Sequence, residues 1–148
     1  MLPTNYQNLI NDYRSQFDIY YQELVSYNDK VNLTAIVERN DVFTKHFLDS
    51  ILAIDAIPQN ASIVDVGTGA GFPGLPIKIV RPDVEVTLVD SLNKRINFLN
   101  MLCQKLNWST CSATNAHAPP TRELPLLTPA RQKPTQQGIP STNIKINK

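Results

Sequence analysis

Several kinds of residue are scarce in this chain of 148 residues, and each shortage excludes a class of protein. The only two cysteines, Cys103 and Cys111, are too few for a disulfide scaffold and have no metal-ligand spacing. No apolar run approaches the roughly 18–20 residues of a membrane-spanning helix. The N-terminus lacks a basic segment followed by an apolar one, so we expect no signal peptide. We therefore expect a cytoplasmic protein with no metal site and no membrane segment.

Charge of one sign is also lacking, because 14 Lys and Arg face 13 Asp and Glu and leave a net charge of +1. This balance hides a change in composition after Trp108. Residues 109–148 hold six of the eleven prolines, no aromatic residue, and five basic residues against Glu123 alone, whereas residues 1–108 carry a net charge of −3. Prolines interrupt helices and strands, and little apolar surface remains to offset the entropy of ordering. We predict a low-order Pro-rich tail at 109–148.

Residues 1–60 are predicted to form a helical part. Apolar side chains recur at helical intervals and predict a helix over 5–27, behind a capping box that begins at Thr4. Asp41 is expected to cap a second helix whose apolar positions run to Ile54. The helical part then ends in a turn of Pro, Gln and Asn.

From residue 61 the pattern alternates between strands and helices. Residues 61–66 are short and β-branched, as in a buried parallel strand, and after a helix a second strand is predicted at 84–89. Ser91 is expected to cap a last helix. This order predicts an α/β fold in which residues 61–108 form the N-terminal half of a Rossmann-like core.

Glycine is scarce too, and four of the five glycines lie in the short stretch from Gly67 to Gly74. This stretch joins a strand to a helix, where a nucleotide-like ligand meets an open α/β sheet. Glycine permits positive φ and a close approach of the backbone to a ligand. Asp90 ends the next predicted strand, where a carboxylate can accept hydrogen bonds from both hydroxyls of a ribose. The alternative is a loop that only packs the strand against the helix, but such a loop does not need Asp90 at this spacing.

The spacing of the glycines separates two classes of cofactor. Gly67, Gly69 and Gly71 form a Gly-x-Gly-x-Gly pattern, and Phe72 stands where a dinucleotide fingerprint has its third glycine. Asp65 precedes the first glycine by two residues. Together these features resemble motif I of the class I S-adenosylmethionine-dependent methyltransferases more than an NAD fingerprint. An NAD-dependent oxidoreductase is therefore disfavoured, and the absence of Gly-Lys-Ser/Thr excludes a P-loop.

A closer resemblance rests on four motifs that occur in order with suitable separations. They are Asn32-Leu33-Thr34-Ala35, Lys45-His46-Phe47-Leu48-Asp49-Ser50, the run from Val64 to Gly74, and Asp90-Ser91-Leu92-x-Lys94-Arg95-x-x-Phe98-Leu99. Over about residues 5–107 the chain resembles the bacterial 16S ribosomal RNA guanine-N7 methyltransferases, also called the glucose-inhibited division protein B family. The resemblance implies a Rossmann-like class I methyltransferase core preceded by N-terminal helices and incomplete at its C-terminus.

The resemblance also implies S-adenosyl-L-methionine as cofactor and 16S ribosomal RNA or the small ribosomal subunit as partner. Asp90 would hold the ribose, and Asp65 would act near the methionine amino group. The residues implied to line the methionine end, partly through backbone amides, are Gly67, Gly69, Gly71 and Phe72. Guanine N7 exposes a lone pair and the sulfonium is an activated donor, so we name no catalytic base and expect catalysis to be mainly positioning.

Three residues are candidate RNA contacts. His46 lies in a family motif and would touch the cofactor or an RNA phosphate, with a packing histidine as the alternative. Lys94 and Arg95, in the first turn of the last predicted helix, are candidate phosphate contacts, with a solvated helix face as the alternative. A basic patch would be extended by Lys78, Arg81 and Lys105.

The resemblance ends near Asn107, and the further strands of a full member do not appear in residues 109–148. A frameshift or truncation is one hypothesis and an evolved tail is the other; the nucleotide sequence after codon 108 distinguishes them. Two parallel strands leave a sheet incomplete, so we expect marginal stability and weak or no methyl transfer. The alternative function is therefore an inactive remnant with weak or no cofactor binding. The sequence does not indicate an oligomeric state.

Overall fold

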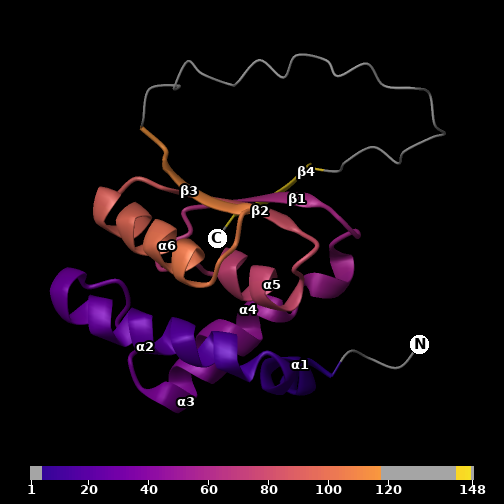
Figure 1. Ribbon diagram of the computed structural model, residues 1–148, viewed down its shortest axis with the longest axis horizontal. Coiled ribbons are helices and arrows are strands. Elements are labelled where there is room, and N and C mark those ends of the chain that lie inside the picture. Colours follow the sequence, from indigo (N-terminus) through magenta and orange to yellow (C-terminus); the bar gives the residue numbers. More distant parts are fainter. Residues whose placement is uncertain (1–4, 118–142, 148) are drawn as a thin grey trace.

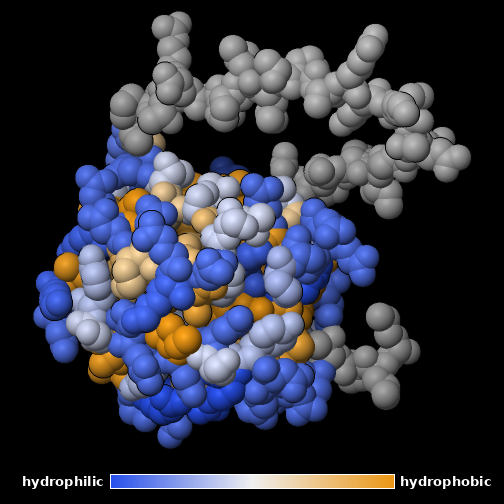
Figure 2. Space-filling view, viewed as in Figure 1, coloured by the Kyte–Doolittle hydropathy of each residue, from blue (hydrophilic) through white to orange (hydrophobic). Residues whose placement is uncertain are grey.

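The computed structural model describes residues 5–117 and 143–147. In this part of the chain the helices lie on one side of a parallel sheet, and the N-terminal helices form a further layer beneath α5 and α6 (Figure 1). The surface seen in Figure 2 is mostly hydrophilic, and the large apolar side chains that are exposed on the described part are Val37, Leu52 and Leu92. None of the described helices combines the length and apolar character that a membrane span requires.

Two helices replace the single helix predicted over 5–27. They are α1, Tyr6–Asp12, and α2, Arg14–Val31, separated at Tyr13, whose φ of −103° and ψ of 23° depart from helical values. The side chain of Asn5 caps α1 by accepting a hydrogen bond from the Asn8 amide at 3.0 Å. Thr4, the residue expected to begin a capping box, lies outside the described residues.

A second helical segment runs through α3 (Arg39–Asp41), the π-helix η1 (Val42–Leu48) and α4 (Asp49–Ile51). The prediction that Asp41 caps this segment is wrong. The cap is Glu38, whose Oε2 accepts a hydrogen bond from the Asp41 amide at 2.9 Å. A 3-10 turn, η2 (Ile54–Ala56), leads to the sheet.

The sheet has four described strands in the order β3-β2-β1-β4, and every pairing is parallel. Two helices lie along one face, each between two strands that are consecutive in the chain; they are α5 (Gly74–Val80) and α6 (Asn93–Lys105). The predicted α/β fold with a parallel sheet is therefore confirmed. The strands are β1 (Ser62–Val66), β2 (Glu85–Asp90), β3 (Cys111–Asn115) and β4 (Asn143–Asn147).

Two of these strands lie in the segment for which the composition predicts low order. β3 is held against α6 by Asn100, whose side chain accepts from the Ala113 amide at 3.1 Å and donates to the Ala113 carbonyl at 3.2 Å. β4 pairs with β1, so that β1 has neighbours on both sides. The prediction of low order is wrong at both strands; residues 118–142 and 148 lie outside the described part.

The helical part and the sheet share one apolar core. Phe17 and Tyr20 on α2, Phe47 on η1 and Phe98 on the last helix are fully buried. The Tyr20 ring lies 5.0 Å from the Phe47 ring and 5.5 Å from the ring of Phe72, which follows the last of the three spaced glycines. Because burying one such side chain stabilises a fold by about 1.5–3 kcal/mol, these contacts fix the glycine loop against the N-terminal helices.

Candidate functional site

The loop between β1 and α5 uses its glycines for backbone geometry. Gly67, Gly69 and Gly71 have φ values of 74°, 61° and 105°, all in the left-handed region. An L-residue with a side chain pays about 1–2 kcal/mol to adopt such a conformation. The three spaced glycines of the sequence are therefore a structural requirement of this loop.

The loop has two ends with different surroundings, which we call the packed end (Gly71–Gly74) and the open end (Gly67–Gly69). A Cβ added at Gly71 would lie 2.5 Å from the Tyr20 hydroxyl and 2.7 Å from Leu75 Cδ1. A Cβ added at Gly67 would meet no atom within 4 Å. The packed end therefore needs glycine for space, while the open end leaves room beside the backbone.

Asp65 closes the loop from inside the protein. Its side chain is fully buried, and Oδ2 accepts hydrogen bonds from Thr68 Oγ1 at 2.7 Å and from the Gly74 amide at 2.8 Å. The carboxylate thus ties the start of the loop to the start of α5. The predicted role of Asp65 near an amino group stays a prediction.

Asp90 lies at the end of β2, beside the open end of the loop. Its Oδ2 accepts from the Gly69 amide at 2.9 Å and its Oδ1 accepts from the Leu92 amide at 3.1 Å. Burial alone would raise the pKa of Asp90, but these two backbone hydrogen bonds and the Arg95 guanidinium together bring the pKa below its usual value. Asp90 is therefore an ionised acceptor, placed next to the glycines as the spacing predicts.

The backbone amides of the loop donate within the protein. The amides of Gly67 and Thr68 both donate to the Val89 carbonyl, at 2.8 and 3.1 Å, and the amides of Gly71 and Phe72 both donate to the Thr68 carbonyl at 3.0 Å. The expected contact of a cofactor with these amides would therefore compete with bonds that hold the loop.

His46 joins two of the sequence motifs to the loop. Its ring stacks on Phe72 with centroids 4.3 Å apart and an interplanar angle of 9°, and its Nε2 lies 3.1 Å from Thr34 Oγ1. The sequence places His46 near the site, but it does not reveal that Thr34 contacts His46 or that Tyr20 contacts the loop. Tyr20 donates to the Ala70 carbonyl at 2.6 Å, a contact between residues 50 positions apart that no local pattern reveals.

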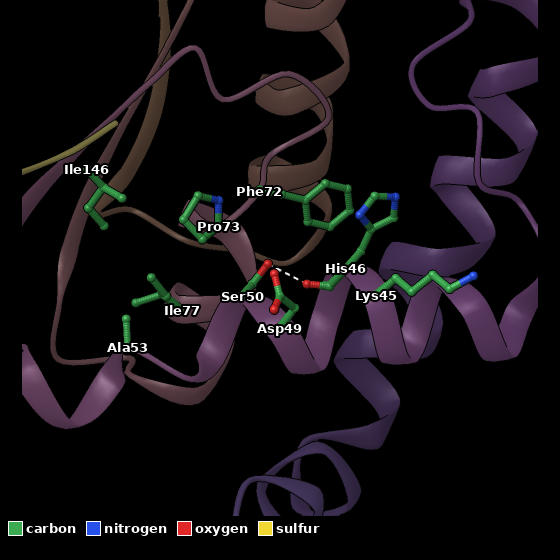
Figure 3. A pocket seen from close by; sticks show the side chains of 9 residues that line it. All are labelled: Lys45, His46, Asp49, Ser50, Ala53, Phe72, Pro73, Ile77 and Ile146. Atoms are coloured by element: carbon green, nitrogen blue, oxygen red, sulfur yellow. Dashed lines mark hydrogen bonds between the residues drawn. The ribbon is translucent and has the colours of Figure 1, made fainter. Parts of the chain in front are cut away.

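A pocket of about 320 Å³ opens beside the packed end of the loop (Figure 3). Some lining residues come from η1, from α4 and from Ala53 just after α4. The others come from the loop, α5 and β4. The lining residues are Lys45, His46, Asp49, Ser50, Ala53, Phe72, Pro73, Ile77 and Ile146.

The predicted basic surface is mostly committed to internal contacts. Lys78 is only 2% exposed, and its Nζ donates to the carbonyls of Pro82 and Val84 and to Thr110 Oγ1 at 2.6–2.8 Å. Burial lowers the pKa of Lys78. Lys78 is therefore not part of a basic surface, and the other two candidates are ion-paired, Arg81 with Asp83 and Lys105 with Glu23.

The start of α6 also differs from its prediction. The N-cap is Leu92, with no side-chain hydrogen bond, so the predicted cap at Ser91 is wrong. Lys94 is exposed in the first turn, whereas Arg95 is half-buried and lies 3.4 Å from Asp90 Oδ2. The contact that the structure shows for Arg95 is therefore with the Asp90 carboxylate, and its predicted contact with a phosphate stays a prediction. Across the described ranges no three His, Cys, Asp or Glu side chains gather as a metal site would require.

Comparison with known proteins identifies the family. The family model described as rRNA small subunit methyltransferase G (GidB) matches residues 13–124, most of the chain. The chain belongs to this family. The match reaches beyond Asn107, where the motifs alone end, and includes β3.

Curated relatives carry the same description. The chain is 53% identical over 104 residues to ribosomal RNA small subunit methyltransferase G of Desulforamulus reducens, covering 69% of this chain and 43% of that protein. It is 46% identical over 118 residues to the Streptococcus pneumoniae protein of the same name, covering 72% and 50%. The chain thus spans about half the length, or less, of these relatives.

Among solved structures, coclaurine N-methyltransferase bound to N-methylheliamine and SAH aligns with a TM-score of 0.44 and 15% identity, over 78% of this chain and 41% of that one. A putative caffeoyl-CoA O-methyltransferase from Staphylococcus aureus aligns with the same TM-score and 17% identity, over 70% and 50%.

Proposed function

We propose that this chain carries the cofactor-binding half of an S-adenosylmethionine-dependent methyltransferase that acts in the cytoplasm on N7 of a guanine in 16S ribosomal RNA. The curated relatives, named ribosomal RNA small subunit methyltransferase G, support the class of reaction and the RNA. One observation carries the proposal: Asp90 Oδ2 accepts a hydrogen bond at 2.9 Å from the amide of Gly69, which lies in the loop of three glycines with positive φ. This arrangement supports a ribose site, because an ionised carboxylate lies beside an open backbone surface.

The residues at the open end fit a nucleoside with a positively charged amino-acid tail. The space beside Gly67, where a Cβ would meet nothing, admits a ligand against the backbone. A carboxylate offers about four acceptor positions, and the contacts of Asp90 with Arg95, at 3.4 Å, are its longest. Asp90 would therefore accept hydrogen bonds from two ribose hydroxyls while it keeps the Gly69 and Leu92 amides.

The chain's own residues would supply position and charge. S-adenosylmethionine, when bound, supplies a methyl group on a sulfonium, and guanine N7 needs no deprotonation. Gly67, Gly69 and Gly71 would flank the methionine end through carbonyl groups and Cα atoms, with the buried charge of Asp65 behind them and Phe72 at the far side. Holding the reactants in line can supply roughly 7–11 kcal/mol of the barrier reduction.

RNA contacts form a separate part of the proposal. His46 borders the pocket beside the loop, and Lys94 is exposed near the mouth of the ribose site, so both would meet RNA that enters from this side. Arg95 would assist by holding Asp90 and would reach a phosphate only with its outer nitrogen. The interface involves few cations, so we expect a shallow salt dependence of RNA binding.

Calorimetric titration of the full chain tests the cofactor assignment. We expect binding of S-adenosylmethionine and S-adenosylhomocysteine but not of NAD, and a loss of roughly tenfold or more in affinity in Asp90→Asn. The matched control is Asp29→Asn, an exposed carboxylate on α2 far along the chain from the loop. Binding of NAD instead, or equal affinities in Asp90→Asn and the parent chain, would contradict the assignment.

Transfer is tested separately with undermethylated small-subunit RNA and a radiolabelled methyl donor, followed by mapping of 7-methylguanosine by strand scission. The alternative, a remnant that does not transfer methyl groups, is tested by the same experiment. Cofactor binding with labelling at N7 supports the enzyme. An absence of labelling, with or without cofactor binding, supports the remnant, and labelling elsewhere than N7 contradicts the proposed position.

A further inference from the structure

The segment Lys45–Ser50 carries a sequence motif that the cofactor site does not use. Most of its side chains make contacts within the protein, since Phe47 is fully buried in the core and the Ser50 hydroxyl donates to the His46 carbonyl. Lys45 pairs with Asp41 at 3.0 Å. Asp49 differs, because it is exposed and, across residues 5–117 and 143–147, its carboxylate takes part in no hydrogen bond or ion pair.

Asp49 lines the 320 Å³ pocket together with Lys45, His46, Ser50 and several apolar side chains. Figure 3 shows Phe72, Pro73, Ile77 and Ile146 presenting apolar surface, while Asp49 and Ser50 come from the adjoining helical segment. The volume lies near the lower end of the roughly 300–1,000 Å³ typical of ligand sites. Single unstacked bases of RNA are bound in this way, with apolar or aromatic contacts to the faces and polar contacts to one edge.

We infer that Asp49 determines base specificity by accepting hydrogen bonds from N1–H and the 2-amino group of the target guanine. This inference rests on the proposed function and deepens it. A carboxylate is an acceptor-only group with two adjacent oxygens, and guanine presents two adjacent donors on its Watson–Crick edge. Adenine presents the lone pair of N1 at the same position, which faces the carboxylate unfavourably. Asp49 therefore selects guanine over adenine.

The same contact assists the reaction. N7 lies on the Hoogsteen edge of the purine, next to the Watson–Crick edge that carries N1, so a base held by Asp49 leaves the lone pair of the reacting nitrogen free. The lone pair of N7 forms the new N–C bond as the S–C bond breaks, the bonding electrons stay on sulfur, and no proton moves. The base becomes a cation while the sulfur becomes neutral. A fixed negative charge on the Watson–Crick edge of the base stabilises the developing cation.

Nucleotide binding to the full chain tests the inference. The probes are guanosine, inosine, adenosine and 7-methylguanosine 5′-monophosphates, titrated by calorimetry or ligand-observed NMR in the presence of S-adenosylhomocysteine, whose own binding is recorded first. We expect the 7-methylguanosine nucleotide to bind most tightly, followed by guanosine, inosine and adenosine. The step from guanosine to adenosine should be roughly tenfold or more, as for a good bidentate base contact.

Two variants make the result specific. Asp49→Asn should bring the guanosine and adenosine nucleotides within about twofold of each other, because the amide cannot offer two acceptors. Asp29→Asn, an equal charge change at an exposed position outside the pocket, should keep the discrimination. Circular dichroism and thermal unfolding verify that both variants fold.

The outcomes separate this inference from the proposed function. Equal binding of guanosine and adenosine nucleotides by the parent chain, no binding of either, or unchanged discrimination in Asp49→Asn would overturn the assignment. Failure of S-adenosylhomocysteine to bind, with guanosine discrimination that depends on Asp49, would contradict the cofactor proposal and keep the guanine site. Cofactor binding without discrimination between guanosine and adenosine nucleotides would contradict the guanine site and keep the cofactor proposal.

Discussion

The packed end and the open end of the glycine loop use the same residue type for different purposes. At Gly71 the neighbours are Tyr20 from α2 and Leu75 from α5, so the absence of a side chain lets the helical part close on the sheet. At Gly67 nothing lies where a Cβ would be. Glycine therefore provides space for packing at one end of the loop and borders open space at the other. Substitutions at the two ends should separate stability from binding.

The largest effect is expected at the packed end. Gly71→Ala places a Cβ 2.5 Å from the Tyr20 hydroxyl and forces alanine to a φ of 105°. Overpacking and backbone strain together should lower the free energy of unfolding by about 3–5 kcal/mol. Urea denaturation followed by circular dichroism measures the change. A loss below about 1 kcal/mol would show that the packed end is looser than these contacts indicate.

Tyr20→Phe tests the support of the packed end from the other side. The variant leaves the buried Ala70 carbonyl without its 2.6 Å hydrogen bond, so unfolding should require about 1–3 kcal/mol less free energy. Burial, with the nearby Asp65 charge, keeps the pKa of Tyr20 well above its usual value, so the hydroxyl remains a donor. Tyr21→Phe is the matched control, because its hydroxyl donates to the Val37 carbonyl in an exposed setting. Equal losses in the two variants would contradict a special role for Tyr20.

The comparison also explains how far sequence reasoning reached. The sequence predicts the glycine loop and the position of Asp90 at the end of the next strand, because strand ends and glycine spacing are local signals. It does not predict the supports of the packed end, since Tyr20 meets Ala70 across 50 residues and Lys78 is buried among carbonyl groups that the sequence does not place together.

Other errors have the same origin. The break at Tyr13 and the π-helix η1 contain neither proline nor glycine, so nothing in the local sequence marks them. They occur where the N-terminal helices pack on the core, and tertiary packing overrides local propensity there. β3 and β4 are short strands in a Pro-rich, mostly polar context. They form by pairing with β2 and β1, which the local sequence does not indicate.

Asp90 should show a smaller effect with a characteristic pH dependence. At neutral pH, Asp90→Asn should lower the free energy of unfolding by about 1–2 kcal/mol, because the amide cannot accept from both the Gly69 and the Leu92 amides as the carboxylate does. The folded pKa of Asp90 lies below its unfolded value of about 3.9, so its contribution is present above roughly pH 4–5. It is lost as the pH falls through the folded pKa.

Urea titrations of the parent chain and Asp90→Asn between pH 3 and 7 check this sign. The difference in stability between the two proteins should be largest near neutral pH and shrink in acid. Asp83, whose pKa the Arg81 guanidinium also lowers, titrates in both proteins and cancels in the difference. A difference that grows in acid would contradict the role of Asp90 as an ionised acceptor.

The smallest effect on stability and the sharpest contrast are expected for Gly67→Ala. The variant adds a methyl group in open space and incurs only the backbone strain of a φ of 74°, about 1 kcal/mol. The same methyl group occupies the space that a cofactor would need, so affinity for S-adenosylhomocysteine should fall by roughly tenfold or more, measured by calorimetry. Gly71→Ala, in contrast, should lose mainly stability, because its Cβ collides with Tyr20 and Leu75. A stable Gly67→Ala variant with undiminished affinity would show that the ligand does not bind at the open end. Both ends of the loop would then have a structural role only.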